Sequence, residues 1–86
     1  MILVSQNKEK IINFERIAEV IVSDKDICVR DNFEVQKGLI IATYESEERA
    51  KEVFQEIIKA YLDCNEHSVL AEYAYVKNKV YEMPIN

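Results

Sequence analysis

An amphipathic stretch at residues 46–64 is the strongest constraint on the fold of this chain. Apolar side chains recur there every three or four positions, at Ala50, Val53, Phe54, Ile57, Ile58, Tyr61 and Cys64. This spacing places them on one stripe of an α-helix, and charged side chains fill the opposite face. The sequence therefore predicts one long helix that carries an apolar stripe.

The energetics of this helix require a partner surface. We expect burial of its six larger apolar side chains, which are Val53, Phe54, Ile57, Ile58, Tyr61 and Leu62. Their burial contributes about 1.5–3 kcal/mol each. Ordering the backbone costs about 1–2 kcal/mol per residue, which exceeds that gain over a helix of this length. The stripe must therefore pack against the rest of the chain.

Polar residues mark both ends of the predicted helix. Ser46 is a good N-cap, because its hydroxyl can accept a hydrogen bond from a backbone N–H of the first turn. Glu47 and Lys51 form a favourable acid-before-base pair one turn apart. The polar residues 65–68 predict a break that ends the helix. Residues 69–76 suit either a strand or a helical turn, and we favour extended structure.

Residues 1–44 are rich in β-branched side chains and predict an antiparallel sheet of four or five strands. The short apolar run at residues 1–5 is typical of a buried strand. Residues 10–23 form either one long strand or two strands with a bend near residues 15–16. Residues 27–35 alternate between apolar and polar side chains, as a half-buried strand does.

Gly38 is the only glycine in the chain and lies between two β-like runs, so we expect it in a hairpin with positive φ. One glycine cannot build the glycine-rich loops of dinucleotide-binding or P-loop proteins. Residues 79–83 predict a short strand that returns to a sheet edge and stops at Pro84. The expected architecture is one α+β domain over residues 1–86, with the helix packed on one face of the sheet and a short C-terminal strand.

Composition and charge exclude several functions. The chain has 86 residues, and its 16 acidic and 11 basic side chains give a net charge of −5, which argues against direct nucleic-acid binding. His67 and the separated Cys28 and Cys64 supply no recognisable metal ligand set, and we expect no cofactor, no metal and no enzymatic activity. Lacking a signal peptide or an apolar span, the protein is expected to be cytoplasmic and not membrane-bound.

Three segments together form a characteristic pattern. They are Ser5, Gln6, Asn7 and Lys8 followed by Ile12, Asn13 and Phe14; the run from Tyr44 to Val53 leading to Glu56 and Ile57; and the ending Val80, Tyr81, Glu82, Met83 and Pro84. This pattern resembles a group of short proteins encoded by phages and mobile elements of Gram-positive bacteria. Asn7 departs from the aspartate expected there. The resemblance implies a mobile-element origin but no particular activity.

The function that we expect is a non-enzymatic binding module, a phage accessory or counter-defence protein that sequesters a host protein. The alternative is a sponge for a small nucleotide signalling molecule, favoured if Tyr73, Tyr75 or Tyr81 line a pocket near a basic side chain. A partner would thus be a host protein or a small anionic ligand. A short chain with open sheet edges also suggests a homodimer.

Five residues of the family-like segments are the expected binding residues: Ser5, Gln6, Lys8, Arg49 and Tyr81. Arg49 is the most informative of them, because a cation near the N-terminus of a helix is locally unfavourable. A salt bridge to a neighbouring carboxylate would explain its position. Recognition of an anionic group is the functional alternative.

Overall fold

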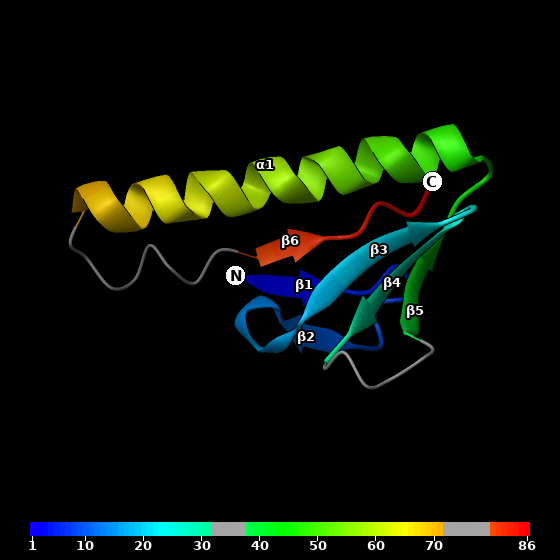
Figure 1. The fold of residues 1–86 in the computed structure, drawn as a ribbon, viewed down its shortest axis with the longest axis horizontal. Helices are drawn as coiled ribbons and strands as arrows, with labels where there is room; N and C mark the ends of the chain where they lie inside the picture. The colour runs from blue at the N-terminus through cyan, green and yellow to red at the C-terminus, as the bar shows by residue number, and fades with distance from the viewer. Residues whose placement is uncertain (32–37, 72–79) are drawn as a thin grey trace.

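The structure is a computed structural model that describes residues 1–31, 38–71 and 80–86, with only the backbone of residues 64–71. Its elements, labelled in Figure 1, are β1 Ile2–Val4, β2 Ile11–Asn13, the 3-10 helix η1 Phe14–Arg16, β3 Glu19–Ser23, β4 Asp26–Arg30, β5 Leu39–Thr43, α1 Glu47–Ala71 and β6 Val80–Glu82. The fold is α+β. One long helix lies across strands that are all short.

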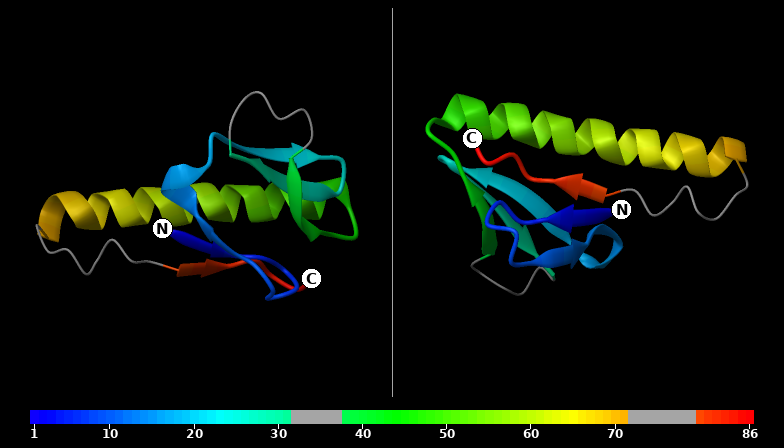
Figure 2. Two further views of the ribbon diagram at one scale, coloured as in Figure 1. Left: turned by 90° about the horizontal axis from the view of Figure 1, so that it is seen from below. Right: turned by 180° about the vertical axis from the view of Figure 1, so that it is seen from behind.

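The strands form two three-stranded sheets, so the prediction of a single sheet of four or five strands was wrong. The first sheet has the order β2-β1-β6, with β2 antiparallel and β6 parallel to the central β1. The second has the order β3-β4-β5 and is antiparallel throughout. The two sheets diverge beneath α1, with β1 and β6 on one side and β3 and β4 on the other (Figure 2).

The chain leaves the first sheet immediately after Asn13. The Asn13 side chain accepts a hydrogen bond from the N–H of Glu15 at 3.1 Å, which starts η1 and turns the backbone away from β1. Of the two alternatives for residues 10–23, the pair of strands with a bend near residues 15–16 is confirmed. Because the bend is sharp, its two halves pair in different sheets.

The first sheet is built on the buried strand predicted at residues 1–5. Met1, Leu3 and Ser5 alternate inward and are 3%, 0% and 2% exposed. Leu3 lies between Ile12 of β2 and Tyr81 of β6, and both side chains pack against the same core. β6 lies at an edge of this sheet, as predicted, although its pairing with β1 is parallel.

The second sheet supplies the other half of the core. Ile27 and Val29 of β4 are buried, as their alternation predicts. A β-bulge between Ile27 and Cys28 lets the neighbouring Ile41 and Ala42 of β5 both point into the core. Residues 32–37, which include part of the strand predicted at residues 27–35, lie outside the described residues.

The reason given for Gly38 was wrong, because its φ is not positive. Glycine is needed there by close approach of the backbone to β4. A Cβ at Gly38 would lie 2.8 Å from the carbonyl oxygen of Val29 and 3.1 Å from Cγ of Arg30. The positive φ values belong to Lys8 (65°) and Asp24 (57°), in the turns before β2 and β4.

Helix α1 begins as predicted and ends later. The Ser46 hydroxyl accepts a hydrogen bond from the N–H of Arg49 at 3.1 Å, which confirms Ser46 as the N-cap. The helix then continues to Ala71, so the polar break at residues 65–68 was wrong and His67 is helical. Those residues include no glycine or proline that would stop a helix. Residues 69–71 are helical rather than extended, and residues 72–76 lie outside the described residues.

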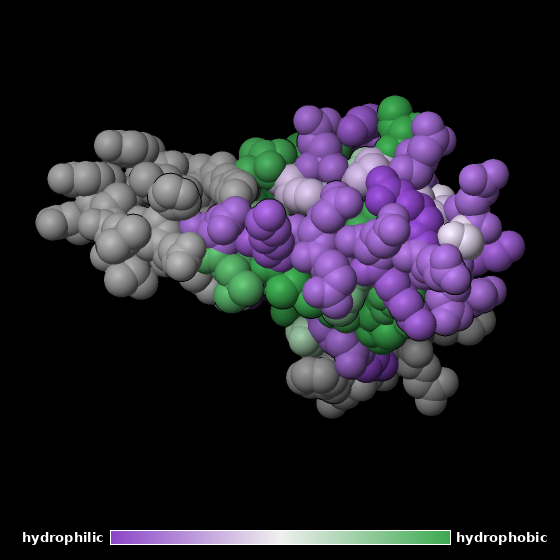
Figure 3. All heavy atoms as spheres, turned by 90° about the horizontal axis from the view of Figure 1, so that it is seen from above, coloured by the Kyte–Doolittle hydropathy of each residue, from purple (hydrophilic) through white to green (hydrophobic). Residues whose placement is uncertain are grey.

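The buried stripe of α1 is narrower than predicted. Ala50, Val53, Ile57 and Ala60 are 0–7% exposed, and Phe54 and Tyr61 are half-buried. Ile58 and Leu62 were expected in the core but are 38% and 56% exposed. The reason is that two short, diverging sheets cover only a narrow line of the helix. Where Figure 3 colours α1, its opposite face is largely hydrophilic, with hydrophobic side chains in small separate groups.

Candidate functional site

The C-terminal segment, residues 80–86, is where the expected binding residues meet. It comprises β6 and the four residues that follow, and it runs along β1 beneath the first half of α1 (Figure 1). Tyr81 belongs to this segment, and Gln6, Lys8 and Arg49 each bind it through their side chains. Four of the five residues are thus brought together by contacts distant in sequence.

Gln6 joins the C-terminal segment to β5. Its side-chain oxygen accepts the N–H of Thr43 at 2.9 Å, and its NH2 group donates to the carbonyl of Thr43 at 3.0 Å. The same NH2 group lies 3.3 Å from the carbonyl oxygen of Pro84 and 2.7 Å from that of Ile85. One amide therefore holds the end of β5 and the end of the chain in a fixed relation.

Lys8 binds the C-terminal segment, whereas the Ser5 hydroxyl has local partners. The Lys8 ammonium lies 2.8 Å from the carboxylate of Glu82, and this hydrogen bond holds the pKa of Glu82 below its usual range. Ser5 is buried; its hydroxyl donates to the side-chain oxygen of Asn7 at 2.7 Å and accepts the N–H of Lys10 at 3.0 Å. Both of these hydrogen bonds stay within the turn that carries Gln6 and Lys8, so the role of Ser5 is to shape that turn.

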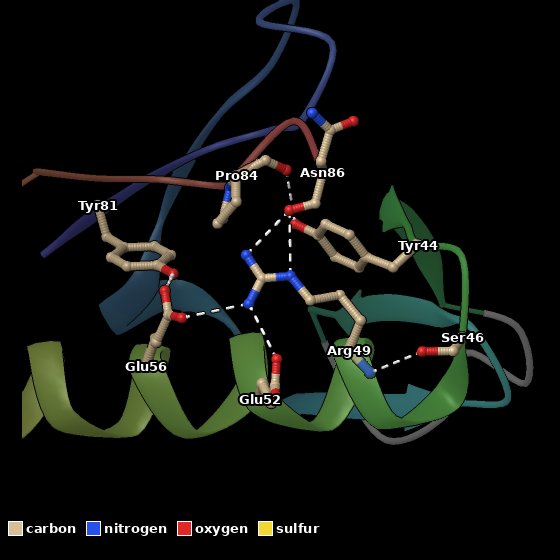
Figure 4. Close-up of polar contacts among 8 residues, drawn as sticks. All are labelled: Tyr44, Ser46, Arg49, Glu52, Glu56, Tyr81, Pro84 and Asn86. Carbon is tan, nitrogen blue, oxygen red and sulfur yellow. Dashed lines mark hydrogen bonds and ion pairs between the residues drawn. The ribbon is translucent and has the colours of Figure 1, made fainter.

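Arg49 is the centre of the polar cluster shown in Figure 4. Its guanidinium donates to the main-chain oxygen of Asn86 from Nε at 3.0 Å and from Nη2 at 2.9 Å. Nη1 lies 3.2 Å from Glu52 and 3.6 Å from Glu56. Its carbon atom Cζ also lies 5.8 Å from the ring centre of Tyr44. The salt-bridge explanation for this arginine is confirmed.

Two tyrosine hydroxyls complete the cluster. Tyr44 donates to the carbonyl oxygen of Pro84 at 2.8 Å, and Tyr81 donates to the carboxylate of Glu56 at 2.7 Å (Figure 4). Burial raises the pKa of Tyr44 to about 12. Partial burial, together with the bond to Glu56, raises the pKa of Tyr81 above its usual range. Both side chains stay protonated as donors through the neutral range.

A cleft opens beside this cluster. Its volume is about 650 Å³, and it is lined by Thr43, Tyr44, Glu45, Ser46, Arg49, Ile85 and Asn86. The walls come from the end of β5, the first turn of α1 and the end of the chain. Hydroxyl groups, one guanidinium and one aromatic ring thus meet in an open, mixed polar and apolar surface.

The described residues offer no metal centre and no membrane span. No group of three or more His, Cys, Asp or Glu side chains lies close enough together there to hold a metal ion. Within the same part of the chain, no helix has both the length and the hydropathy needed to cross a bilayer. Comparison with known protein families, curated proteins and solved structures finds no match to this chain.

Among the residues of the cluster that sequence reasoning missed are Tyr44 and Glu56. Both lie in the family-like segments, but neither differs locally from an ordinary core or surface residue. Tyr73 and Tyr75, considered as partners of Tyr81, lie outside the described residues.

Proposed function

We propose that this chain is a non-enzymatic binding module whose partner is a protein, bound at the surface formed by the C-terminal segment and the first turns of α1. The observation that carries this proposal is the convergence of Gln6, Lys8, Arg49 and Tyr81 on one partly exposed segment beside an open cleft. These polar side chains hold the C-terminal segment in place, and their contacts do not pair a nucleophile with a base as an enzyme active site would. A surface of this kind suits recognition.

The resemblance to short phage and mobile-element proteins bears on the kind of partner. It supports a host protein, sequestered by an accessory or counter-defence protein. The negative net charge of −5 fits a partner with a basic surface, because complementary charge speeds association and selects against acidic partners. Helix α1 borders the proposed site and carries six acidic residues against three basic ones.

The test is affinity capture from host lysate with three versions of the chain. The unaltered protein should retain a host protein, and the double variant Arg49→Ala, Tyr81→Ala should lose it while keeping its circular dichroism spectrum. A matched control is Ile11→Ala, Arg16→Ala, because both side chains are exposed. Ile11 belongs to β2 and Arg16 to η1, which follows β2, whereas the C-terminal segment lies on the other side of β1. Equal capture by all three versions would remove this surface from consideration.

A small anionic ligand is the second candidate. It is favoured by Arg49 beside the ring of Tyr44 and by the hydroxyls of Thr43 and Ser46, which all line the cleft. Glu52 and Glu56 already bind the guanidinium and compete with an anion for it. Calorimetric titration with cyclic dinucleotides distinguishes the two: micromolar binding that Arg49→Ala abolishes supports a nucleotide sponge, and its absence favours a protein partner.

A further inference from the structure

The C-terminal segment is held in the way that a bound peptide is held. β6 adds to the edge of β1 in parallel, pairing Val80 with Ile2 and Glu82 with Val4, and the N–H of Met83 donates to the carbonyl of Val4 at 3.0 Å. Addition of an extended strand to a sheet edge is a common mode of peptide recognition, in which the main chain supplies much of the affinity.

Three successive main-chain oxygens of the segment are bound by side chains of the body. The Tyr44 hydroxyl binds that of Pro84, the Gln6 amide binds that of Ile85, and the Arg49 guanidinium binds that of Asn86, at 2.7–3.0 Å. Main-chain oxygens occur in every peptide, so these donors recognise the backbone and not the side chains at these positions.

One side chain anchors the segment. Met83 is 0% exposed and belongs to the hydrophobic core, and an unbranched thioether side chain adapts readily to an irregular apolar site. By contrast, the polar bonds of Gln6 to Ile85, of Lys8 to Glu82 and of Arg49 to Asn86 lie at exposed positions, where each contributes little. The anchor and the strand pairing therefore do most to hold the segment.

We infer that residues 80–86 occupy a peptide-binding groove and that a partner protein binds by displacing them with an extended segment of its own. This inference rests on the proposed function and refines it: Tyr81 leaves with the segment, so Tyr81→Ala alone should strengthen capture, and the loss expected of the double variant comes from Arg49, which stays to bind the partner. The incoming segment pairs in parallel with β1, places a large flexible apolar side chain where Met83 lies, and presents its next three carbonyls to Tyr44, Gln6 and Arg49. Side chains beyond that point lie against the walls of the cleft that remain, which come from the end of β5 and the first turn of α1.

The segment then acts as a built-in competitor. Because it is part of the same chain, its effective concentration at the groove is of order millimolar, and a free peptide of the same sequence binds the unaltered protein poorly. A true partner overcomes this competition through added contacts in the cleft. This competition selects against peptides that offer only the strand pairing with β1 and the apolar side chain at the position of Met83.

The first experiment weakens the segment within the full-length chain. The probe is a fluorescent peptide with the sequence of residues 80–86, and binding is followed by anisotropy. The variant Met83→Ala should bind this peptide at least tenfold more tightly than the unaltered chain. A peptide carrying alanine in place of methionine should not bind, because it cannot fill the anchor site.

A second variant covers the case in which Met83→Ala does not fold. Glu82 is exposed, so Glu82→Lys leaves the core intact while placing a cation against Lys8. This variant should bind the peptide severalfold more tightly than the unaltered chain does. A peptide that carries the same lysine is the matched control and should lose this gain.

The third experiment locks the groove. Ile2 and Val80 are direct neighbours on β1 and β6, so Ile2→Cys, Val80→Cys in the Glu82→Lys background allows a disulfide that mass spectrometry can verify. The oxidised form should not bind the peptide, and reduction of the same sample should restore binding. Equal binding by the oxidised and reduced forms would overturn the inference, as would no binding by any variant at millimolar peptide.

Failure of the inference and failure of the proposed function give different results. If the locked protein still captures its host partner, the binding module stands and displacement of the segment is wrong. If neither the locked nor the reduced protein captures any host protein while the peptide binds as expected, the groove exists but the proposed function is wrong.

Discussion

A single side chain, Gln6, links parts of the molecule that are far apart in sequence. Its amide bonds to both main-chain groups of Thr43, as a neighbouring strand would, and so closes the outer edge of β5 at that point. The N–H of Gln6 also donates to the carbonyl of Ile41 at 2.9 Å. At the scale of the residue, polar contacts with the main chain decide how the sheets and the chain end meet.

Gln6→Glu should destabilise the protein although the side chain keeps its shape. The carboxylate has no N–H groups, so the carbonyls of Thr43 and Ile85 lose their donor and face a negative charge. We expect a cost of about 1–3 kcal/mol, measured as a lower denaturant midpoint. The control is Asn7→Asp, one position away in the same turn, because it adds the same charge and keeps the acceptor oxygen that Ser5 binds. An unchanged midpoint for Gln6→Glu would show that these bonds contribute nothing.

Adding a side chain at Gly38 should lower the stability of the protein, whereas removing the side chain of Asp24 should not. Gly38→Ala places a Cβ about 2.8 Å from the oxygen of Val29, and we expect destabilisation of about 1–3 kcal/mol through overpacking. Asp24→Gly should be tolerated, because glycine adopts its φ of 57° without strain. Thermal unfolding of both variants tests the steric explanation, and equal melting temperatures would refute it.

Stability should fall as the pH rises above 10, because the folded state holds the Tyr44 proton more tightly. The pKa of this hydroxyl is 10 in the unfolded chain and about 12 in the fold. Between these values the folded protein binds more protons than the unfolded chain, so its stabilisation is complete below pH 10 and is lost towards pH 12. Tyr44→Phe should flatten this dependence in urea unfolding at pH 9–11. An identical slope in the variant would assign the effect to other groups.

At the scale of the element, α1 illustrates how the area of the partner surface limits burial. The helix has 25 residues, and among residues 47–63, whose side chains are described, the fully covered ones are Ala50, Val53, Ile57 and Ala60. The last turns extend past the ends of the strands (Figure 1). Helix length follows from local sequence, whereas the width of the buried stripe follows from what packs against it.

Ile57→Ala and Ile58→Ala form a matched pair on neighbouring positions of α1. Ile57 is 2% exposed, and its truncation leaves a cavity that costs about 2–5 kcal/mol. Ile58 is 38% exposed, so its truncation should cost well under half as much. Chemical denaturation of both variants measures the difference. Equal losses would mean that the stripe is not the core side of the helix.

At the scale of the whole molecule, apolar surface remains uncovered on the second sheet. Ile21 pairs with Cys28, and Cys28 pairs with Ile40. These three residues form a row across the outer face of β3, β4 and β5. Ile21 and Cys28 are half-buried and Ile40 is 53% exposed. A small domain buries only about 60% of its unfolded surface, so such a row favours self-association.

We therefore predict a homodimer at high micromolar concentration, measured by light scattering. Ile40→Glu should shift the equilibrium to monomer, because it places a charge in the row. Ile11→Glu is the control: Ile11 is 76% exposed, but it lies on the other sheet and should not affect association. A scattering mass equal to one chain at every concentration would contradict the prediction.

The local sequence determined those features that depend on neighbouring residues. Periodicity predicted the long helix, the hydroxyl of Ser46 predicted its start, and alternation at Ile27 and Val29 predicted the buried face of β4. The bend near residues 15–16 was one of two alternatives that the sequence left open. Each of these depends on backbone geometry over a few residues, and the local order of side chains determines such geometry.

Only the tertiary structure decided how these elements divide into two sheets. The parallel pairing of β6 with β1 joins the two ends of the chain, and the contact that requires Gly38 joins it to residues of β4. The same holds for the site, since Gln6, Tyr44 and Arg49 meet only because the C-terminal segment lies between them. Long-range pairing depends on which surfaces remain to be covered once the local elements have formed, and no short stretch of sequence contains that information.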